Sequence, residues 1–171
     1  MMTPGIFSAA LLSAASALPA AAQTTPSSPL VTQVTMADLQ SIVEEMGHSV
    51  EAVEDQVVFA KSSDDLFFSV MGAACANDVC RGVNMAVTYD RQPGDTPDDI
   101  NRADIQFAAV SVWYNEDSIG VSRYLILDNG ISRENLKYNL EVLLNISANV
   151  ISSIGQEPAP APVILPKSGA N

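Results

Sequence analysis

The chain is 171 residues long, and its 20 acidic and 8 basic residues give it a formal net charge of −12. Such an acidic surface repels the phosphates of nucleic acids and of anionic lipid head groups, so the composition argues against both as partners. The length suits a single domain built around one hydrophobic core.

Residues 1–22 have the pattern of a secretory signal peptide. An apolar run of small residues, Ile6 to Leu18, is followed by Pro19 and by an A-x-A cleavage site at Ala20 and Ala22. The usual Lys or Arg before the apolar run is missing. A retained membrane anchor is the alternative, but a spanning helix needs about 20 strongly apolar residues, and this run is short and rich in alanine. We predict a protein that is periplasmic or secreted.

The next segment predicts a flexible lead and a first helix. Residues 23–34 are polar and contain proline, which is typical of a mobile segment. Thr35 and Asp38 resemble a capping box, and Gly47 is suited to end the helix in a left-handed turn. His48 follows, and since no catalytic partner for it can be identified, we interpret it as a surface or strand-edge residue.

The middle of the chain has the pattern of an antiparallel meander. Two alternating apolar runs between Leu66 and Tyr89 predict a β-hairpin, because side chains alternate between the two faces of a strand. A single preceding strand, centred on residues 56–59, would join this hairpin through a polar turn at residues 62–65.

Cys75 and Cys80 flank the turn of that hairpin and are the only cysteines in the chain. An exported protein meets an oxidising compartment, and a four-residue loop brings the flanking positions close enough for one disulfide bond. Such a bond would stabilise the fold by roughly 2 kcal/mol. A free pair and metal or redox chemistry are the alternatives, but zinc needs four ligands and C-x4-C differs from the redox motif C-x-x-C. We predict a structural disulfide and no metal site.

The sequence after the hairpin predicts a short helix and two more strands. Residues 91–99 contain two prolines and a glycine and must leave the sheet, and Thr96-Pro97 favours the start of a helix that ends near Ile105. Alternating residues then predict antiparallel strands at Phe107–Tyr114 and Ile119–Leu127.

A long helix and a tail complete the chain. Ser132 is a suitable N-cap, and apolar residues then recur every three or four positions, which is typical of a helix packed on a sheet. Gly155 would end this helix. Residues 156–171 alternate proline with alanine and predict an extended, disordered tail.

The expected domain, residues 35–155, is therefore an α+β fold in which an N-terminal and a long C-terminal helix pack on an antiparallel five-stranded sheet. This order of elements, the paired cysteines, Ile100-Asn101 before a strand, and the ILDNGISRENL segment at residues 126–136 together resemble the YbjN family of bacterial proteins. The resemblance covers Thr35 to Ile154. It implies a fold similar to that of type III secretion chaperones and a role in sensory-transduction regulation.

One family motif is altered in this chain. Where family members have a tryptophan and a second asparagine just after the first asparagine, this sequence has Arg102-Ala103-Asp104. Any role attached to the segment from Asn101 to Asp104 is therefore not carried over.

The leading functional hypothesis is a non-enzymatic, protein-binding or chaperone-like regulatory module of the bacterial cell envelope. The resemblance implies capture of a client polypeptide or formation of a homodimer, and an exposed sheet edge is a physical means of binding one. Trp113 and Tyr114 are the candidate partner surface. Neighbouring residues of a strand point to opposite faces, so one of the two aromatic side chains would be exposed and available to a partner. The alternative is that both lie in the core or in a dimer interface.

A small-molecule or ion-binding sensor domain is the alternative function. It is suggested by acidic clusters at residues 64–65, 95, 98–99 and 116–117, although none follows the twelve-residue calcium loop. We expect no enzyme and no cofactor, since the sequence has no G-x-S-x-G motif, no glycine-rich phosphate loop and no metal-ligand cluster.

Overall fold

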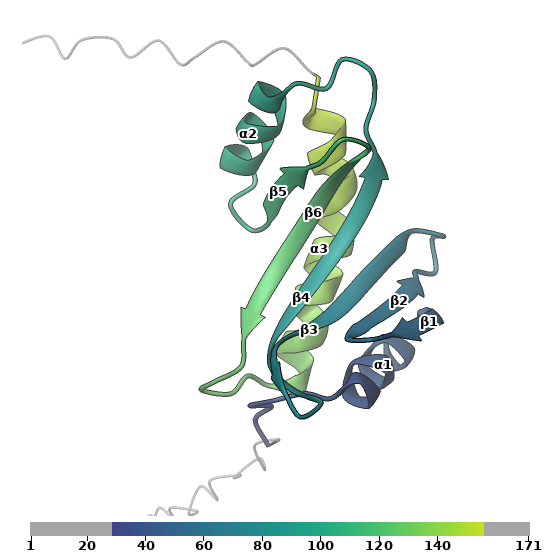
Figure 1. Cartoon of the computed structure of the whole chain (residues 1–171), viewed down its shortest axis with the longest axis vertical. Coiled ribbons are helices and arrows are strands. Elements are labelled where there is room, and N and C mark those ends of the chain that lie inside the picture. Colours follow the sequence, from purple (N-terminus) through teal and green to yellow (C-terminus); the bar gives the residue numbers. More distant parts are fainter. Residues whose placement is uncertain (1–28, 156–171) are drawn as a thin grey trace, which may run out of the picture.

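The computed structural model describes residues 29–155, so the predicted signal peptide and the predicted tail lie outside the described residues. The described part forms three helices and one antiparallel sheet of six strands (Figure 1). No helix in this part is both long and apolar enough to cross a membrane. In chain order the elements are α1 (Met36–Glu45), β1 (Ser49–Glu54), β2 (Val57–Lys61), β3 (Phe67–Ala76), β4 (Val79–Asp90), α2 (Pro97–Gln106), β5 (Ser111–Tyr114), β6 (Ser118–Ile126) and α3 (Arg133–Ser153).

The strands lie in the order β1-β2-β3-β4-β6-β5. α1 packs against β1, β2 and β3, and α3 packs against β4 and β6, on the same face of the sheet. Val58, Val70 and Met85 are cross-strand neighbours on this face and are fully buried, which confirms the predicted alternation. The other face of the sheet carries neither of these helices (Figure 1).

All three helices begin where the sequence predicts. The Thr35 hydroxyl accepts a hydrogen bond from the backbone N–H of Asp38 at 3.2 Å, and the Asp38 carboxylate accepts one from the backbone N–H of Thr35 at 2.8 Å. Thr96 and Asp99 form the same capping box at α2, and Ser132 caps α3. Because the bonds to threonine favour the ionised form, the pKa values of Asp38 and Asp99 are lowered.

The sheet has six strands, so the prediction of five is wrong. β1 and β2 form a hairpin where the sequence indicated one strand. The turn between them contains Asp55, whose φ of +49° lies in the left-handed region, which aspartate tolerates better than most side chains. The two-residue turn Asp55-Gln56 contains neither glycine nor proline, so the sequence pattern does not mark it as the end of a strand.

The strand predicted at Phe107–Tyr114 is also shorter, because the end of α2 uses the backbone groups that the strand would need. The N–H of Phe107 donates to the carbonyl of Ala103 at 3.0 Å, and the N–H of Val110 donates to the carbonyl of Phe107 at 3.0 Å. β5 consequently begins at Ser111.

The predicted disulfide joins Cys75 and Cys80, which are direct cross-strand partners in β3 and β4. The hairpin closes through Asn77 and Asp78, both with positive φ, as tight two-residue turns require. Gly72 provides space for the sulfurs. A Cβ atom on Gly72 would collide with Cys80 Sγ and lie 2.8 Å from Cε of Met36.

The fold begins before Thr35, where the sequence predicted the start of order. Val31 forms an antiparallel bridge with Ile131, and Val34 forms one with Cys80. Val34 is 1% exposed and belongs to the core. The end of the predicted flexible lead is thus part of the packed domain, although its composition is polar.

Candidate functional site

The face of the sheet opposite α1 and α3 carries large apolar side chains that none of the helices in the described part covers. Five of the ten large hydrophobic residues exposed in the described part lie on it by strand register, with exposures of 39 to 67%. We call this surface the open face. Its five apolar residues are Phe59, Phe67, Trp113, Tyr124 and Ile126.

Two of these aromatic side chains lie against glycines of neighbouring strands. Trp113 of β5 pairs with Gly120 of β6, and a Cβ atom on Gly120 would overlap the tryptophan ring. A Cβ atom on Gly82 of β4 would likewise overlap the Tyr124 hydroxyl. Because the two glycines have no side chain, Trp113 and Tyr124 can approach the backbone closely at these positions.

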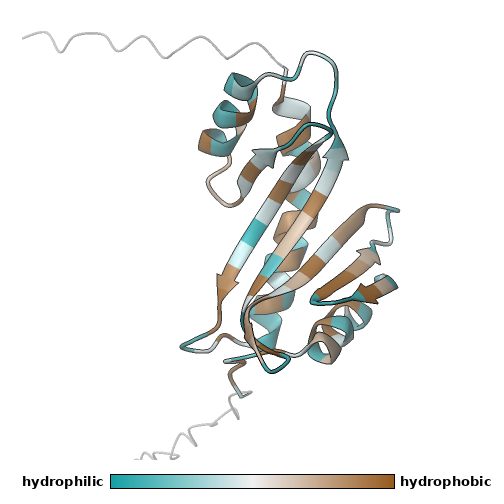
Figure 2. Cartoon of the chain, in the orientation of Figure 1, coloured by the Kyte–Doolittle hydropathy of each residue, from teal (hydrophilic) through white to brown (hydrophobic). Residues whose placement is uncertain are grey.

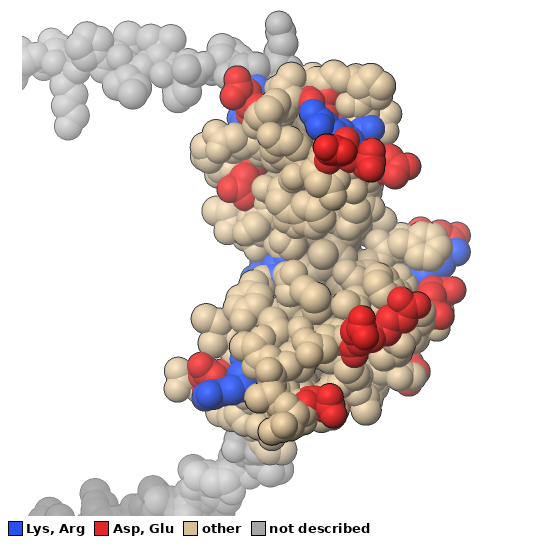
Figure 3. All heavy atoms as spheres, in the orientation of Figure 1, with Lys and Arg blue, Asp and Glu red and all other residues tan. Residues whose placement is uncertain are grey.

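The open face is also poor in charge. α3 lies behind the strands in the view of Figure 1, so the open face points toward the reader. Figure 3 shows most acidic and basic side chains toward the margins of this side, with a broad uncharged area between its upper and lower parts. Lys61, at one margin, has its ammonium nitrogen 5.4 Å from the centre of the Phe67 ring. In the hydropathy colouring of Figure 2, apolar and more polar positions alternate along much of β4 and β6.

Trp113 and Tyr114, the predicted partner surface, point to opposite faces of β5 and are 39% and 41% exposed. Trp113 belongs to the open face. Tyr114 pairs with Ile119 on the other face, where the Arg91 guanidinium lies 5.2 Å from the centre of its ring. Neither residue is buried in the domain core, and their part in partner binding stays a prediction.

The outer edge of β5 is protected by α2. The Asp104 carboxylate accepts a hydrogen bond from the backbone N–H of Val112 at 2.8 Å. Because Val112 lies in an edge strand, this bond occupies a donor that another strand would otherwise use. The open face is therefore a better candidate for partner binding than this edge.

Sequence reasoning missed four members of the open face: Phe59, Phe67, Tyr124 and Ile126. A signal was present at Phe67-Phe68, because two adjacent aromatic residues in a strand must point to opposite faces. Which face the helices cover depends on tertiary packing, so the alternation alone does not identify the exposed ring.

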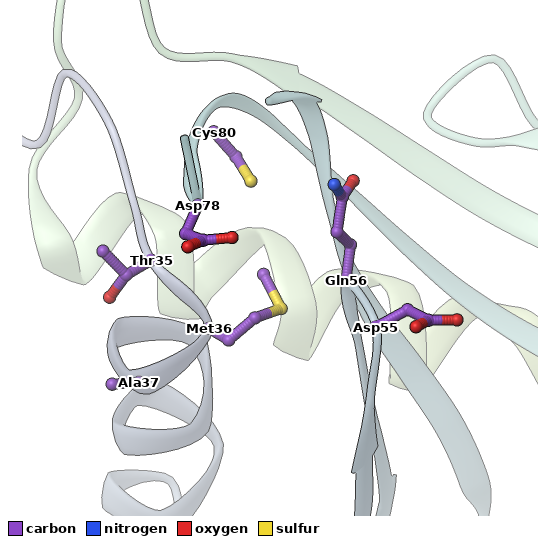
Figure 4. Close-up of a pocket in the computed structure, with 7 residues that line it drawn as sticks. All are labelled: Thr35, Met36, Ala37, Asp55, Gln56, Asp78 and Cys80. Carbon is purple, nitrogen blue, oxygen red and sulfur yellow. The ribbon is translucent and has the colours of Figure 1, made fainter. Parts of the chain in front are cut away.

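A small hollow of about 280 Å³ lies beside the disulfide (Figure 4). Met36 at the start of α1 and Cys80 of β4 line it together with Asp55, Gln56 and Asp78. Its volume is at the lower limit for small-molecule sites, and no group of three or more His, Cys, Asp or Glu residues within residues 29–155 is arranged to hold a metal ion.

The acidic clusters are largely occupied by local structure. Asp65 pairs with Lys61 at 2.6 Å, Asp95 accepts a hydrogen bond from the backbone of Gln92 at 2.7 Å, and Asp99 caps α2. These carboxylates stabilise turns and a helix start.

His48 was predicted to be a surface or strand-edge residue, and it directly precedes the edge strand β1. It is half-buried, and its ring packs edge-on against Phe68 with 5.3 Å between the ring centres. Desolvation lowers its pKa, although the charge of Asp64 acts in the opposite direction. The burial depends on β3 and on α3, which sequence-local reasoning about His48 does not include.

The comparisons with known proteins identify the fold. No protein-family model matches the chain, and no curated protein sequence matches it. The crystal structure of YbjN from E. coli is similar with a TM-score of 0.58 and 12% identity, covering 72% of this chain and 92% of that one. A chain of the HopA1–SchA chaperone–effector complex is similar with a TM-score of 0.52 and 8% identity, covering 70% of this chain and 98% of that one.

The chain therefore has an α+β fold similar to those of YbjN, named as a proposed transcription regulator, and of a protein in a chaperone–effector complex. This confirms the predicted fold class apart from the number of strands. At such low identity the likeness concerns the fold alone.

Proposed function

We propose that the protein is a non-enzymatic, chaperone-like protein-binding module of the bacterial cell envelope, and that it binds its partner on the open face. The observation that carries this proposal is that five exposed apolar side chains share a sheet face that no helix within residues 29–155 covers and on which most charged side chains lie toward the margins.

Exposed apolar surface of this kind is typical of protein interaction sites. Isolated exposed apolar residues are common on proteins, whereas a rimmed apolar patch marks an interface. Aromatic residues contribute strongly to binding, since they remove a large apolar area from water with few rotatable bonds. Trp113 and Tyr124 already rest on the sheet and would lose little freedom on binding.

The fold neighbours support the same class of function. One is a chain of a chaperone–effector complex, and the other is named as a proposed regulator. Both descriptions are compatible with a domain whose role is to bind another protein, either a client polypeptide or a second copy of itself.

The proposed envelope location rests on the disulfide and on the predicted signal peptide. A bridged Cys75–Cys80 pair is stable in the periplasm or outside the cell, where the environment is oxidising.

Site-specific photocrosslinking in the producing bacterium tests the proposal. A photoreactive phenylalanine analogue is placed at Phe67 or at Ile126 on the open face, and at Tyr138 on α3 as a matched control. Phe67 and Tyr138 are equally exposed, at 62% and 61%, but lie on opposite sides of the domain. We expect discrete crosslinked species from Phe67 and Ile126 and none of the same size from Tyr138.

Light scattering on the purified domain distinguishes the two kinds of partner. A dimer that Phe67→Ser and Ile126→Ser convert to monomer identifies a second copy as the occupant. A monomer with a crosslinked species of different mass identifies another protein. Identical crosslinking from all three positions, or from Tyr138 alone, would contradict the assignment of the open face.

A further inference from the structure

A second, larger cavity lies on the helix-covered side of the sheet. Its volume is about 750 Å³, within the range of about 300 to 1,000 Å³ that is typical of small-molecule sites. α1 covers β1, β2 and β3, whereas α3 covers β4 and β6, and the cavity lies where these two covered areas meet. It is lined by the segment after α1, the turn between β2 and β3, Tyr89 of β4 and one side of α3.

His48 lines this cavity, and both of its ring nitrogens are buried without a hydrogen-bond partner among residues 29–155. Desolvation lowers the pKa of the ring, which favours its uncharged form. A neutral imidazole offers one N–H donor and one acceptor nitrogen. Leaving both unpaired is costly, so a molecule that pairs with either one gains a favourable interaction.

The rest of the lining determines which chemistry fits. Met46, Leu66, Leu144 and Ala148 contribute apolar surface. The Tyr89 hydroxyl is already used, since it donates a hydrogen bond to Ser147 Oγ at 3.0 Å. The apolar walls therefore favour a mainly apolar ligand, with His48 as its polar contact.

The charges at the rim disfavour an anion. Lys137 is paired with Glu45, with 2.5 Å between Nζ and Oε2. Asp64 and Glu141 also line the cavity, and within the described residues neither forms an ion pair. A carboxylate or phosphate would meet uncompensated negative charge here.

We propose that this cavity binds an uncharged, mainly apolar small molecule whose hydroxyl group hydrogen-bonds to His48. Both nitrogens are shielded in the present position of the side chain, so the imidazole ring turns toward the cavity when the ligand binds. The ligand's hydroxyl group then donates to one imidazole nitrogen or accepts from the other, and the remaining molecule fills the space between α1 and α3. The site lies on the opposite side of the sheet from the open face, so it is a function in addition to protein binding.

Three probes of equal ring size test this chemistry: 2-naphthol, naphthalene and 2-naphthoate. His48 is the only histidine, so its ring protons give a unique pair of NMR signals in the whole protein. Methyl signals of Leu144 report binding of probes that do not contact His48. We expect 2-naphthol to shift the His48 signals and to bind roughly tenfold more tightly than naphthalene, the effect of one hydrogen bond to a buried unpaired group. 2-Naphthoate should bind more weakly than 2-naphthol.

Two variants and a control sharpen the result. His48→Leu should remove the preference for 2-naphthol over naphthalene, and Leu144→Trp should block both probes by filling the cavity while leaving the His48 side chain in place. Ile105→Ala, at a 73% exposed position of α2 away from the cavity, should change neither affinity.

Equal affinities of the unmodified protein for 2-naphthol and naphthalene would overturn the proposal, as would unshifted His48 signals or unchanged binding to Leu144→Trp. None of these outcomes affects crosslinking from Phe67 on the open face, so failure of this inference is distinguishable from failure of the proposed function.

Discussion

Glu45, the last residue of α1, accepts hydrogen bonds from Arg133, the first residue of α3, although 88 residues separate them. Arg133 Nη2 lies 2.6 Å from Glu45 Oε1, and its Nε lies 3.1 Å from Oε2. The same Nη2 donates to Ser41 Oγ at 3.0 Å. We call these hydrogen bonds the Glu45–Arg133 fork. The fork joins α1 to α3 next to Met46 and Lys137, which line the cavity that contains His48.

The fork predicts a specific pH dependence of stability. Hydrogen bonds from Arg133 first, and then from Lys137, lower the pKa of Glu45 from its ordinary 4.5 to about 2. A carboxyl whose pKa is lowered by folding stabilises the fold above its unfolded pKa and loses that contribution as the pH falls through the folded value. Glu45→Gln should therefore be less stable than the unmodified protein at pH 7, and this difference should shrink between pH 4.5 and 2.

Urea unfolding at several pH values measures this difference. Glu54→Gln is the control, because Glu54 is exposed on β1 and forms no ion pair within residues 29–155. A Glu45→Gln curve that runs parallel to that of the unmodified protein down to pH 2 would show that the fork does not contribute.

Reduction of the disulfide should destabilise the domain without unfolding it. The closed loop is short, so the chain-entropy model gives a loss of about 2 kcal/mol. Denaturant unfolding with and without a reducing agent tests this, and the double variant Cys75→Ser/Cys80→Ser, which has no bond to reduce, serves as the control. A reductant effect on the double variant as large as that on the unmodified protein would contradict the assignment.

Gly120→Ala should displace Trp113. The added Cβ would overlap the indole ring, so the ring must leave the sheet surface and become more exposed. Trp113 is the only tryptophan, and its fluorescence emission should therefore shift to longer wavelength. Loss of the contact should cost about 1 kcal/mol in stability. Unchanged emission would mean that the ring does not rest on Gly120.

Asp104→Ala should expose the outer edge of β5. The backbone N–H of Val112 would lose its partner, at a cost of about 1 to 2 kcal/mol, and would become available to a strand of another molecule. We expect concentration-dependent self-association in sedimentation experiments. Asp98→Ala, at an exposed position in the first turn of the same helix, is the matched control. A variant that stays as monodisperse as this control would argue against edge protection by Asp104.

Much of the fold follows from signals contained in a few neighbouring residues. Thr35 with Asp38 and Thr96 with Asp99 form capping boxes within four residues, and Cys75 and Cys80 face each other because a tight turn separates them. The hairpin of β1 and β2, which the sequence did not predict, also depends on a few neighbouring residues. A two-residue turn at Asp55-Gln56 carries no glycine or proline, so the hairpin that it closes is hard to distinguish from one strand.

The two candidate sites depend on packing between distant segments. The exposure of Phe67 and the burial of Phe68 depend on which face of β3 the helices cover. The surroundings of His48 include Lys137, Glu141 and Leu144, about 90 residues further along the chain. The sequence predicts the alternation that produces both sites, but the choice of face follows from the tertiary arrangement.

The close contact between Gly72 and the disulfide predicts how the sequences of proteins with this fold diverge. Because any side chain at position 72 would meet Cys80 Sγ, the two cysteines and this glycine form a set of three linked positions. Substitutions should therefore follow an order in evolution: the cysteines are lost first, and only then does position 72 accept a larger residue. In related chains that lack both cysteines, position 72 should accept residues other than glycine, whereas chains that keep the pair should keep the glycine.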